Sequence, residues 1–301
     1  MTTFSRRQFL TALTGAVALA PVLAHARNPN KKLQLKFMCP RWGATDSWDE
    51  FCRRVKEAGY DGVETPAPKN EKELQEMLAA LKRYRLELVV MALPGPSDVS
   101  VHQKVFEEIL RSGAALKPLF INCQTGKDFF SFEQNRSIIE VAARVSRETG
   151  VKIIHETHRG KFSFAAQVTR QFIEALPDLR LTLDISHWCN VSESLLENQQ
   201  EAVELAISRT EHVHARIGHQ QGPQVNDPRA PEWQKAVNAH LAWWDKVVAA
   251  HLHRGSPYLT ITPEFGPPNY MPTKPYSREP LASQWEVNVH MMELLKKRYL
   301  A

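Results

Sequence analysis

Short apolar runs and longer amphipathic segments alternate along the chain from residue 33 to its end. In the short runs the side chains alternate between two faces, as in a strand, while the longer segments repeat apolar residues at helical spacing. Strands are predicted at residues 33–39, 62–65, 86–92, 118–123, 151–156, 179–184, 211–214 and 258–264. Helices are predicted at residues 47–58, 71–83, 101–112, 133–149, 165–175, 193–208, 232–253 and 282–298. Eight strand-then-helix units predict an α/β fold of one domain, a (β/α)8 or TIM barrel.

Four consecutive predicted strands end on a side chain that can bind a metal ion, namely Glu156, Asp184, His214 and Glu264. The carboxyl ends of the strands meet at one face of such a barrel, where its catalytic residues lie. Taken alone, a carboxylate at a strand end is more often a helix cap, and a lone histidine is more often a core residue. The recurrence in register favours one divalent-metal site. Three carboxylates and one imidazole suit Mn²⁺, Mg²⁺ or Co²⁺ best, and Zn²⁺ stays open.

Other polar side chains are expected near the same end of the barrel. Glu64 ends the second strand and is a candidate contact to the substrate or to a ligand, although a buried glutamate bonded to a neighbouring loop fits equally well. His155, His158 and Arg159 lie at or just after the end of the fifth strand and are candidates for binding substrate oxygens. A salt bridge within the loop is an equal account of these three residues.

Aromatic residues and two long loops predict where a pocket would form. Trp42, Trp188 and Phe265 are candidates for an apolar wall against a sugar ring, and core packing explains Trp188 nearly as well. The proline-rich segments at residues 221–231 and 266–275 follow the seventh and eighth strands. Long loops at these places are where a barrel enzyme builds its binding pocket.

Charge and composition agree with one catalytic domain. The formal net charge is +5 over 301 residues, and +3 remains without Arg6 and Arg7 of the N-terminal leader. The chain carries no Lys/Arg stripe, which argues against a nucleic-acid partner. It also has no Gly/Ser linker, repeat or charge block that would mark a second module.

The leader resembles a twin-arginine export signal. Residues 5–10 read SRRQFL, an apolar run follows at residues 13–23, and residues 24–26 read AHA, which is typical of a cleavage site. A transmembrane anchor is the alternative, but the run is short for a bilayer and contains glycine and proline. We therefore expect no stable membrane anchor, the twin-arginine export machinery as a partner, and a periplasmic location. The expected layout is a signal at residues 1–26, cleaved after Ala26, and the barrel domain at residues 27–301.

The residue pattern resembles the xylose-isomerase-like barrel superfamily, especially its ketose epimerases and sugar isomerases, from the first strand to the last helix. Six residues carry the resemblance in chain order: Glu156, Asp184, His187, His214, Arg216 and Glu264. The resemblance implies one divalent ion, commonly manganese, held by the three acidic residues and the histidine at the strand ends. It also implies that His187 and Arg216 hold substrate oxygens and that Glu156 and Glu264 exchange the substrate proton.

The expected function is therefore an isomerase or epimerase that abstracts a proton next to a sugar carbonyl through a metal-stabilised enediolate. Residues 155–160 (HETHRG) and 216–231 differ from the usual epimerase loops and favour a branch that handles 3-keto sugars formed by oxidation of glycosides. A lyase or hydratase acting on such keto-sugars is the main alternative. An abasic-site endonuclease would need a multi-metal cluster and a DNA-binding surface, and a non-catalytic sugar-binding protein stays open. Self-association into a homo-oligomer is also left open.

Overall fold

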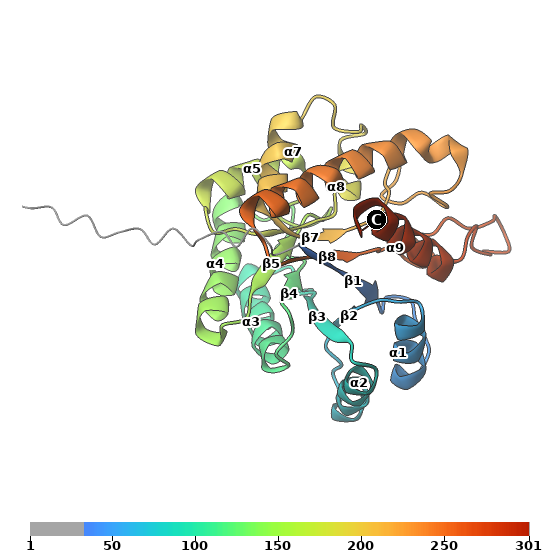
Figure 1. The fold of residues 1–301 in the computed structure, drawn as a ribbon. Helices are drawn as coiled ribbons and strands as arrows, with labels where there is room; N and C mark the ends of the chain where they lie inside the picture. The colour runs from blue at the N-terminus through green and yellow to red at the C-terminus, as the bar shows by residue number, and fades with distance from the viewer. Residues whose placement is uncertain (1–32, 301) are drawn as a thin grey trace, which may run out of the picture. The chain divides into compact units, whose positions relative to one another are not determined.

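All eight predicted strands are present in residues 33–300, the part of the chain that the structure, a computed structural model, describes. They are β1 (Gln34–Pro40), β2 (Gly62–Pro66), β3 (Glu87–Ala92), β4 (Ile121–Cys123), β5 (Ile153–Glu156), β6 (Leu181–Leu183), β7 (Thr210–His214) and β8 (Tyr258–Thr262). Each strand pairs in parallel with the next, and β8 pairs with β1, so the barrel is closed (Figure 1). The predicted signal at residues 1–26 lies outside the described residues.

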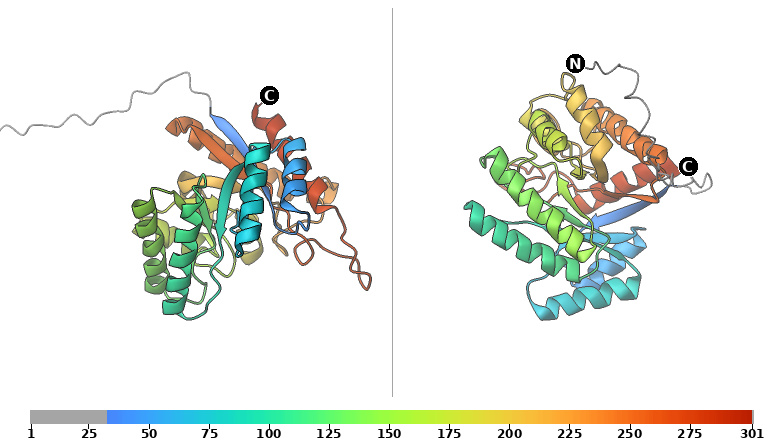
Figure 2. Two further views of the ribbon diagram at one scale, coloured as in Figure 1. Left: turned by 90° about the horizontal axis from the view of Figure 1, so that it is seen from below. Right: turned by 90° about the vertical axis from the view of Figure 1, so that its left-hand side faces the viewer.

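Helices follow the strands and lie around the outside of the barrel, as the turned views also show (Figure 2). They are α1 (Trp48–Glu57), α2 (Glu71–Tyr84), α3 (Val99–Ala115), α4 (Phe132–Thr149), α5 (Ala166–Ala175), α6 (Ser186–Val191), α7 (Gln200–Arg209), the 3₁₀ turn η1 (Pro231–Trp233), α8 (Gln234–Arg254) and α9 (Gln284–Leu300). Within residues 33–300 no helix is long and apolar enough to cross a membrane.

Local signals in the sequence explain where several helices begin and end. Ser47 caps α1 by accepting a hydrogen bond from the backbone N–H of Glu50, and Ser131 forms a capping box with Gln134 at the start of α4. The predicted stop at Gly150 is confirmed, because this residue ends α4 in the left-handed region at φ 72°.

One helix prediction is wrong at its start. The helix predicted from residue 193 begins only at Gln200, and the short α6 precedes it directly after β6. Glu193 and Leu196 have φ values of 45° and 60°, and this left-handed backbone cannot be part of an α-helix. The chain therefore crosses residues 193–199 as a loop.

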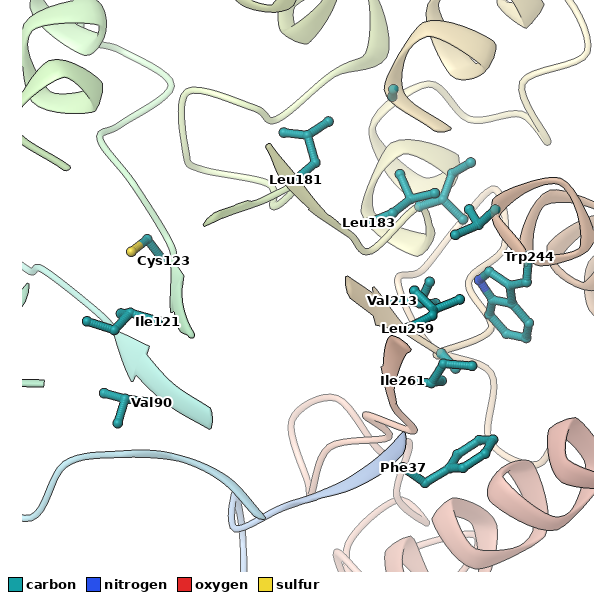
Figure 3. Close-up of a cluster of buried hydrophobic side chains, with 14 of the residues drawn as sticks. Phe37, Val90, Ile121, Cys123, Leu181, Leu183, Val213, Trp244, Leu259 and Ile261 are labelled. Atoms are coloured by element: carbon teal, nitrogen blue, oxygen red, sulfur yellow. The ribbon is translucent and has the colours of Figure 1, made fainter. Parts of the chain in front are cut away.

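The strands have two different faces. Outward-facing side chains such as Phe37, Val213 and Ile261 belong to the main hydrophobic core, where Trp244 of α8 packs with them (Figure 3). Inside the barrel the apolar cluster is small and consists of Met38, Val89, Phe120 and Ile154. Most interior positions nearer the carboxyl ends of β5 to β8 are instead polar and buried, namely Glu156, Thr182, Asp184, His212, His214, Thr260, Thr262 and Glu264. The fold thus concentrates buried polar groups where barrel enzymes carry out their chemistry.

Candidate metal centre

The four predicted metal ligands meet at the carboxyl ends of β5 to β8. Glu156 and His214 are the last residues of β5 and β7, while Asp184 follows β6 by one residue and Glu264 follows β8 by two. One nitrogen or oxygen atom from each of the four lies within 4.8 Å of the other three. His214 Nδ1 is 2.9 Å from Glu264 Oε2 and 3.5 Å from Glu156 Oε1. The structure thus brings together the set that the strand ends predicted.

Glu156 is the least satisfied member of this set. Its side chain is fully buried, and neither carboxylate oxygen has a hydrogen-bond partner among residues 33–300. Burial raises the pKa of Glu156 to about 7, and the nearby carboxylates add to the effect. A buried carboxylate without partners is costly, and a divalent cation would remove that cost. The unpaired oxygens and the oxygen-rich donor set therefore fit a metal ion.

Arg216 supplies a positive charge beside the cluster. Its guanidinium pairs with Asp184, lies 3.5 Å from Glu264 Oε2, and donates to His187 Nε2 at 2.8 Å. Although burial alone would lower the pKa of Arg216, Asp184 and Glu264 raise it above its ordinary value. One arginine faces three ligand carboxylates, so an excess of negative charge remains for a cation to balance.

Glu64 lies beneath His214, away from the cavity wall. Its Oε1 accepts from Asn122 Nδ2 at 2.9 Å and lies 3.1 Å from His214 Nε2, while Oε2 lies 3.2 Å from His212 Nε2 and accepts from Thr262 Oγ1 at 2.5 Å. Burial would raise the pKa of Glu64, but His214 and His212 lower it well below its usual range. An ionised Glu64 favours the proton on His214 Nε2 and leaves the Nδ1 lone pair for a metal. Of the two contacts expected for Glu64, with the substrate or with a ligand, the structure shows the contact with a candidate ligand.

Two further groups of acidic and histidine side chains come close enough for a metal, namely Glu64, His212 and His214, and Glu156, His158 and His187. In the first group the ligand atoms already pair with one another, with Asn122 and with Thr262. We therefore describe the first group as a hydrogen-bond network that supports His214.

His158, His187 and Arg159 lie together at the edge of the site. The rings of His158 and His187 are 3.9 Å apart, and Arg159 lies 5.0 Å from the ring centre of Tyr270. Burial and then Arg216 lower the pKa of His158 to about 3, so its ring is neutral at neutral pH. His187 Nδ1 is buried and has no hydrogen-bond partner in the described part of the chain. These two imidazoles can bind hydroxyl groups as neutral hydrogen-bonding groups.

His155 and Trp188 are not near the cavity, so the structure corrects the prediction that they bind substrate. His155 lies on the strand face opposite to Glu156, where its Nδ1 is 2.7 Å from Thr125 Oγ1 and burial lowers its pKa to about 4. Trp188 is fully buried in the main core, and its Nε1 donates to Ser163 O at 2.9 Å. Trp188 thus supports the loop after β5, and His155 supports the segment after β4. Phe265, also expected at the wall, is fully buried in the same core.

A cavity of about 500 Å³ opens above the cluster. Its lining residues from the second half of the barrel are polar or aromatic, namely His158, Arg216, Glu264 and Tyr270, and those from the first half are Arg41, Trp42, Thr65, Pro66, Met91, Leu93 and Gln124. The size is within the range of small-molecule sites, about 300–1,000 Å³. Of the four candidate ligands, Glu264 lines this cavity and connects the cluster to a space that can hold an organic substrate.

Residues 52–220 match the family model described as xylose isomerase-like TIM barrel. The chain belongs to this family. The matched region of this xylose isomerase-like barrel includes Glu156, Asp184 and His214, while Glu264 follows it. No curated protein matches the sequence.

Several solved structures have the same fold as this xylose isomerase-like barrel. A 3-keto-D-glucoside 4-epimerase from E. coli is 16% identical with a TM-score of 0.60, and the alignment covers 88% of this chain and 100% of that one. A probable 3-DHS dehydratase from Bacillus anthracis is 15% identical with a TM-score of 0.57, at the same coverages of 88% and 100%. A xylose isomerase-like TIM barrel protein from Mycobacterium smegmatis in complex with magnesium is 12% identical with a TM-score of 0.56, covering 84% of this chain and 89% of that chain. At these identities the likenesses show the fold.

Several cavity residues of this xylose isomerase-like barrel were not singled out from the sequence, and Tyr270 makes the most contacts with the predicted residues among those described. It lies in the loop between β8 and α9, its hydroxyl is 3.4 Å from His158 Nε2, and its ring centre is 4.7 Å from the guanidinium of Arg216. The proline-rich composition of residues 266–275 indicated a pocket loop, but no local pattern distinguishes Tyr270 from other residues of that loop.

Proposed function

We propose that this chain is a divalent-metal-dependent enzyme that removes a proton next to a sugar carbonyl and returns it, as a sugar isomerase or epimerase does. The observation that carries the proposal is the convergence of Glu156, Asp184, His214 and Glu264, with both oxygens of Glu156 unpaired, beside an organic-sized cavity that Glu264 lines. The four side chains would hold the ion, with Mn²⁺ as the first candidate and Mg²⁺, Co²⁺ or Zn²⁺ as alternatives. A bound ion of this kind supplies Lewis-acid polarisation of the substrate carbonyl.

The side chains of the site have separate tasks in this proposal. Glu264 lines the cavity, and both Glu264 and Glu156 lie within 3.5 Å of His214 Nδ1, so we assign the two carboxylates to proton exchange with a bound carbon, one as base and one as acid. Arg216 stays charged and binds a substrate oxygen. His158 and His187 bind further hydroxyl groups while neutral. The closed surroundings of the cluster keep bulk water away from the exchanged proton.

Proton exchange in deuterated water tests the proposal directly. The protein is loaded with manganese and incubated with ketoses and 3-keto-glycosides, and deuterium incorporation next to the carbonyl is followed by NMR. We expect incorporation with the wild type and a loss of about 10²-fold or more with Glu156→Gln or Glu264→Gln. Glu87→Gln is the control, because Glu87 lies at the start of β3 and pairs with Lys36. Full exchange by either active-site variant would contradict the assigned pair.

A lyase or hydratase acting on 3-keto-glycosides is the second candidate. It is favoured by His158 and Arg159, which bring an imidazole and a guanidinium to the edge of the site from the HETHRG segment. Such an enzyme would begin with the same proton removal and then expel the group attached at the carbon beta to the carbonyl. The NMR experiment distinguishes the two, because elimination releases that group whereas epimerisation retains it.

Export is a separate proposal. We propose that the twin-arginine motif in residues 5–10 directs this enzyme to the periplasm, where a keto-sugar would be its substrate.

A further inference from the structure

The cavity has one wall that is mostly apolar. On the side that comes from the first half of the barrel, the lining includes Trp42, Pro66, Met91 and Leu93. Trp42 and Leu93 are 38% and 42% exposed, so both present apolar surface that a ligand in the cavity can cover. A sugar hydroxyl placed against this wall would lose its water without gaining a partner.

Few polar groups of this wall are free to bind a ligand. The guanidinium of Arg41 donates to Asp46 O at 2.6 Å and lies 4.3 Å from the ring centre of Trp48. The hydroxyl of Thr65 donates to the carbonyl of the residue that follows it, at 3.1 Å. Arg41 Nη1, which is buried, and the side-chain amide of Gln124 make no hydrogen bond within residues 33–300. The wall therefore offers a mostly apolar surface with one uncommitted amide and one buried, unpaired guanidinium nitrogen.

Trp42 is fixed in this wall by its neighbours. Its ring meets Tyr270 edge-on at 4.9 Å, and its backbone carbonyl accepts from Gln284 Nε2 at 2.8 Å. The ring also lies against Gly266, where a Cβ would be 2.3 Å from Trp42 Cη2. Gly266 is itself held by Gln224, which accepts from its N–H at 2.7 Å. An aromatic side chain held in this way before a ligand arrives loses little entropy on binding.

We infer that this wall binds an aryl aglycone, so that the substrate is an aryl glycoside whose sugar carries the carbonyl. The sugar would lie at Glu264 and Arg216, which rests on the proposed function, and the aromatic ring would lie against Trp42 and Leu93 in the same cavity. A small polar substituent on the ring would bind the amide of Gln124. The volume of about 500 Å³ is within the range of small-molecule sites and is large enough for such a two-part ligand.

Binding of two unreactive glycosides tests this inference separately from catalysis. Phenyl and methyl β-D-glucopyranoside lack the carbonyl, and their dissociation constants are measured by calorimetry with the manganese-loaded full chain. We expect phenyl glucoside to bind at least about tenfold tighter than methyl glucoside. Trp42→Ala should bring the ratio of the methyl glucoside to the phenyl glucoside dissociation constant close to one. Gly266→Ala should reduce this ratio by pushing the ring of Trp42 away. Gly95→Ala is the matched control, because a Cβ at Gly95 meets nothing within 4 Å.

The outcomes separate the inference from the proposed function. Three results would overturn the aryl subsite even where deuterium exchange of a keto-sugar succeeds. They are a ratio of dissociation constants near one in the wild type, absence of binding by both glucosides, and a ratio that is unchanged in both Trp42→Ala and Gly266→Ala. A high ratio that depends on Trp42, together with no deuterium exchange of phenyl 3-keto-glucoside, would keep the aryl subsite and remove the proposed proton chemistry.

Discussion

Replacing Glu64 by glutamine should weaken metal binding without unfolding the barrel. The glutamine side chain has nearly the same shape, and its amide oxygen can still accept from Asn122 and His214, which lie 2.9 and 3.1 Å from Glu64 Oε1. Its NH₂ group would face His212 Nε2, and that ring can adapt by donating from Nδ1 to Thr260 O at 3.0 Å. The hydroxyl of Thr262 can rotate to accept. The variant therefore removes the charge and keeps the hydrogen bonds.

The size of the effect follows from the role of the charge. An ionised Glu64 favours the His214 tautomer with a free Nδ1 and makes the ring a stronger donor to the ion. Loss of such an outer contact costs about 10–100-fold in metal affinity, or about 1.4–2.8 kcal/mol. The free energy of unfolding of the metal-free protein should change less, because Glu64→Gln leaves no polar group in the network without a partner.

Calorimetric titration of chelator-stripped protein with Mn²⁺ measures this affinity, and urea unfolding of the same metal-free samples measures stability. Glu87→Gln serves as control because it makes the same chemical change in the neighbouring strand, where Glu87 lies 2.5 Å from Lys36 Nζ. A dissociation constant of Glu64→Gln within about threefold of wild type would refute the idea that Glu64 orients His214. An equal weakening of Mn²⁺ binding in Glu87→Gln would show that the loss of any negative charge in the barrel has this effect, whatever its position relative to His214.

The wild type should carry one divalent ion per chain by elemental analysis after expression with manganese, and Asp184→Ala or His214→Ala should lose it; a metal-free wild type would contradict the site. His240 should make the fold sensitive to acid, because burial lowers its pKa to about 4 and its Nε2 accepts from the N–H of Gly218 at 3.2 Å. The unfolded chain takes up this proton below about pH 6.5 and the folded chain does not, so about 2–3 kcal/mol of stability is lost between pH 7 and pH 4.5. In denaturant titrations at these two pH values, His240→Gln should lose correspondingly less, and an equal loss would refute the assignment. Replacing the leader arginines at positions 6 and 7 by lysine should retain the precursor in the cytoplasm on fractionation, and continued export would exclude the twin-arginine route.

The barrel and its candidate ligands could be predicted because both depend on short-range patterns. Alternating faces and helical spacing define each unit, and the parallel strands then force their carboxyl ends to one face. Glu156, Asp184, His214 and Glu264 needed no further information to be placed together. The position of Glu64 along the barrel axis could not be predicted in the same way. Strand alternation predicts which face of a strand a side chain occupies, but not its height inside the barrel.

Predictions failed where the sequence has no helical or strand periodicity. Trp188 lies on α6, which has six residues and is too short to show a helical repeat, so its buried position was not visible. His155 precedes Glu156 directly, and strand alternation places it on the opposite face, behind the cavity. Tyr270 reaches the cavity through a long loop whose path depends on contacts such as that between Gly266 and Trp42. Such contacts join residues far apart in the chain and leave no local pattern.

The division of the cavity between the two halves of the barrel has a consequence for how this protein can diversify. All candidate ligands come from β5 to β8, whereas Trp42, Pro66 and Leu93 come from segments at the ends of β1, β2 and β3. Trp42 and Arg216 both contact Tyr270 and can therefore be coupled. Pro66 and Leu93, in contrast, have no hydrogen bond or ring contact with the candidate ligands among residues 33–300, so mutations at these two positions can change selectivity with little effect on the second half. Libraries randomised at these two positions could therefore be screened for new substrates while the candidate metal ligands stay unchanged. Proteins that descend from this barrel can therefore change their substrates by mutations that leave the ligand residues, and with them the reaction, unchanged.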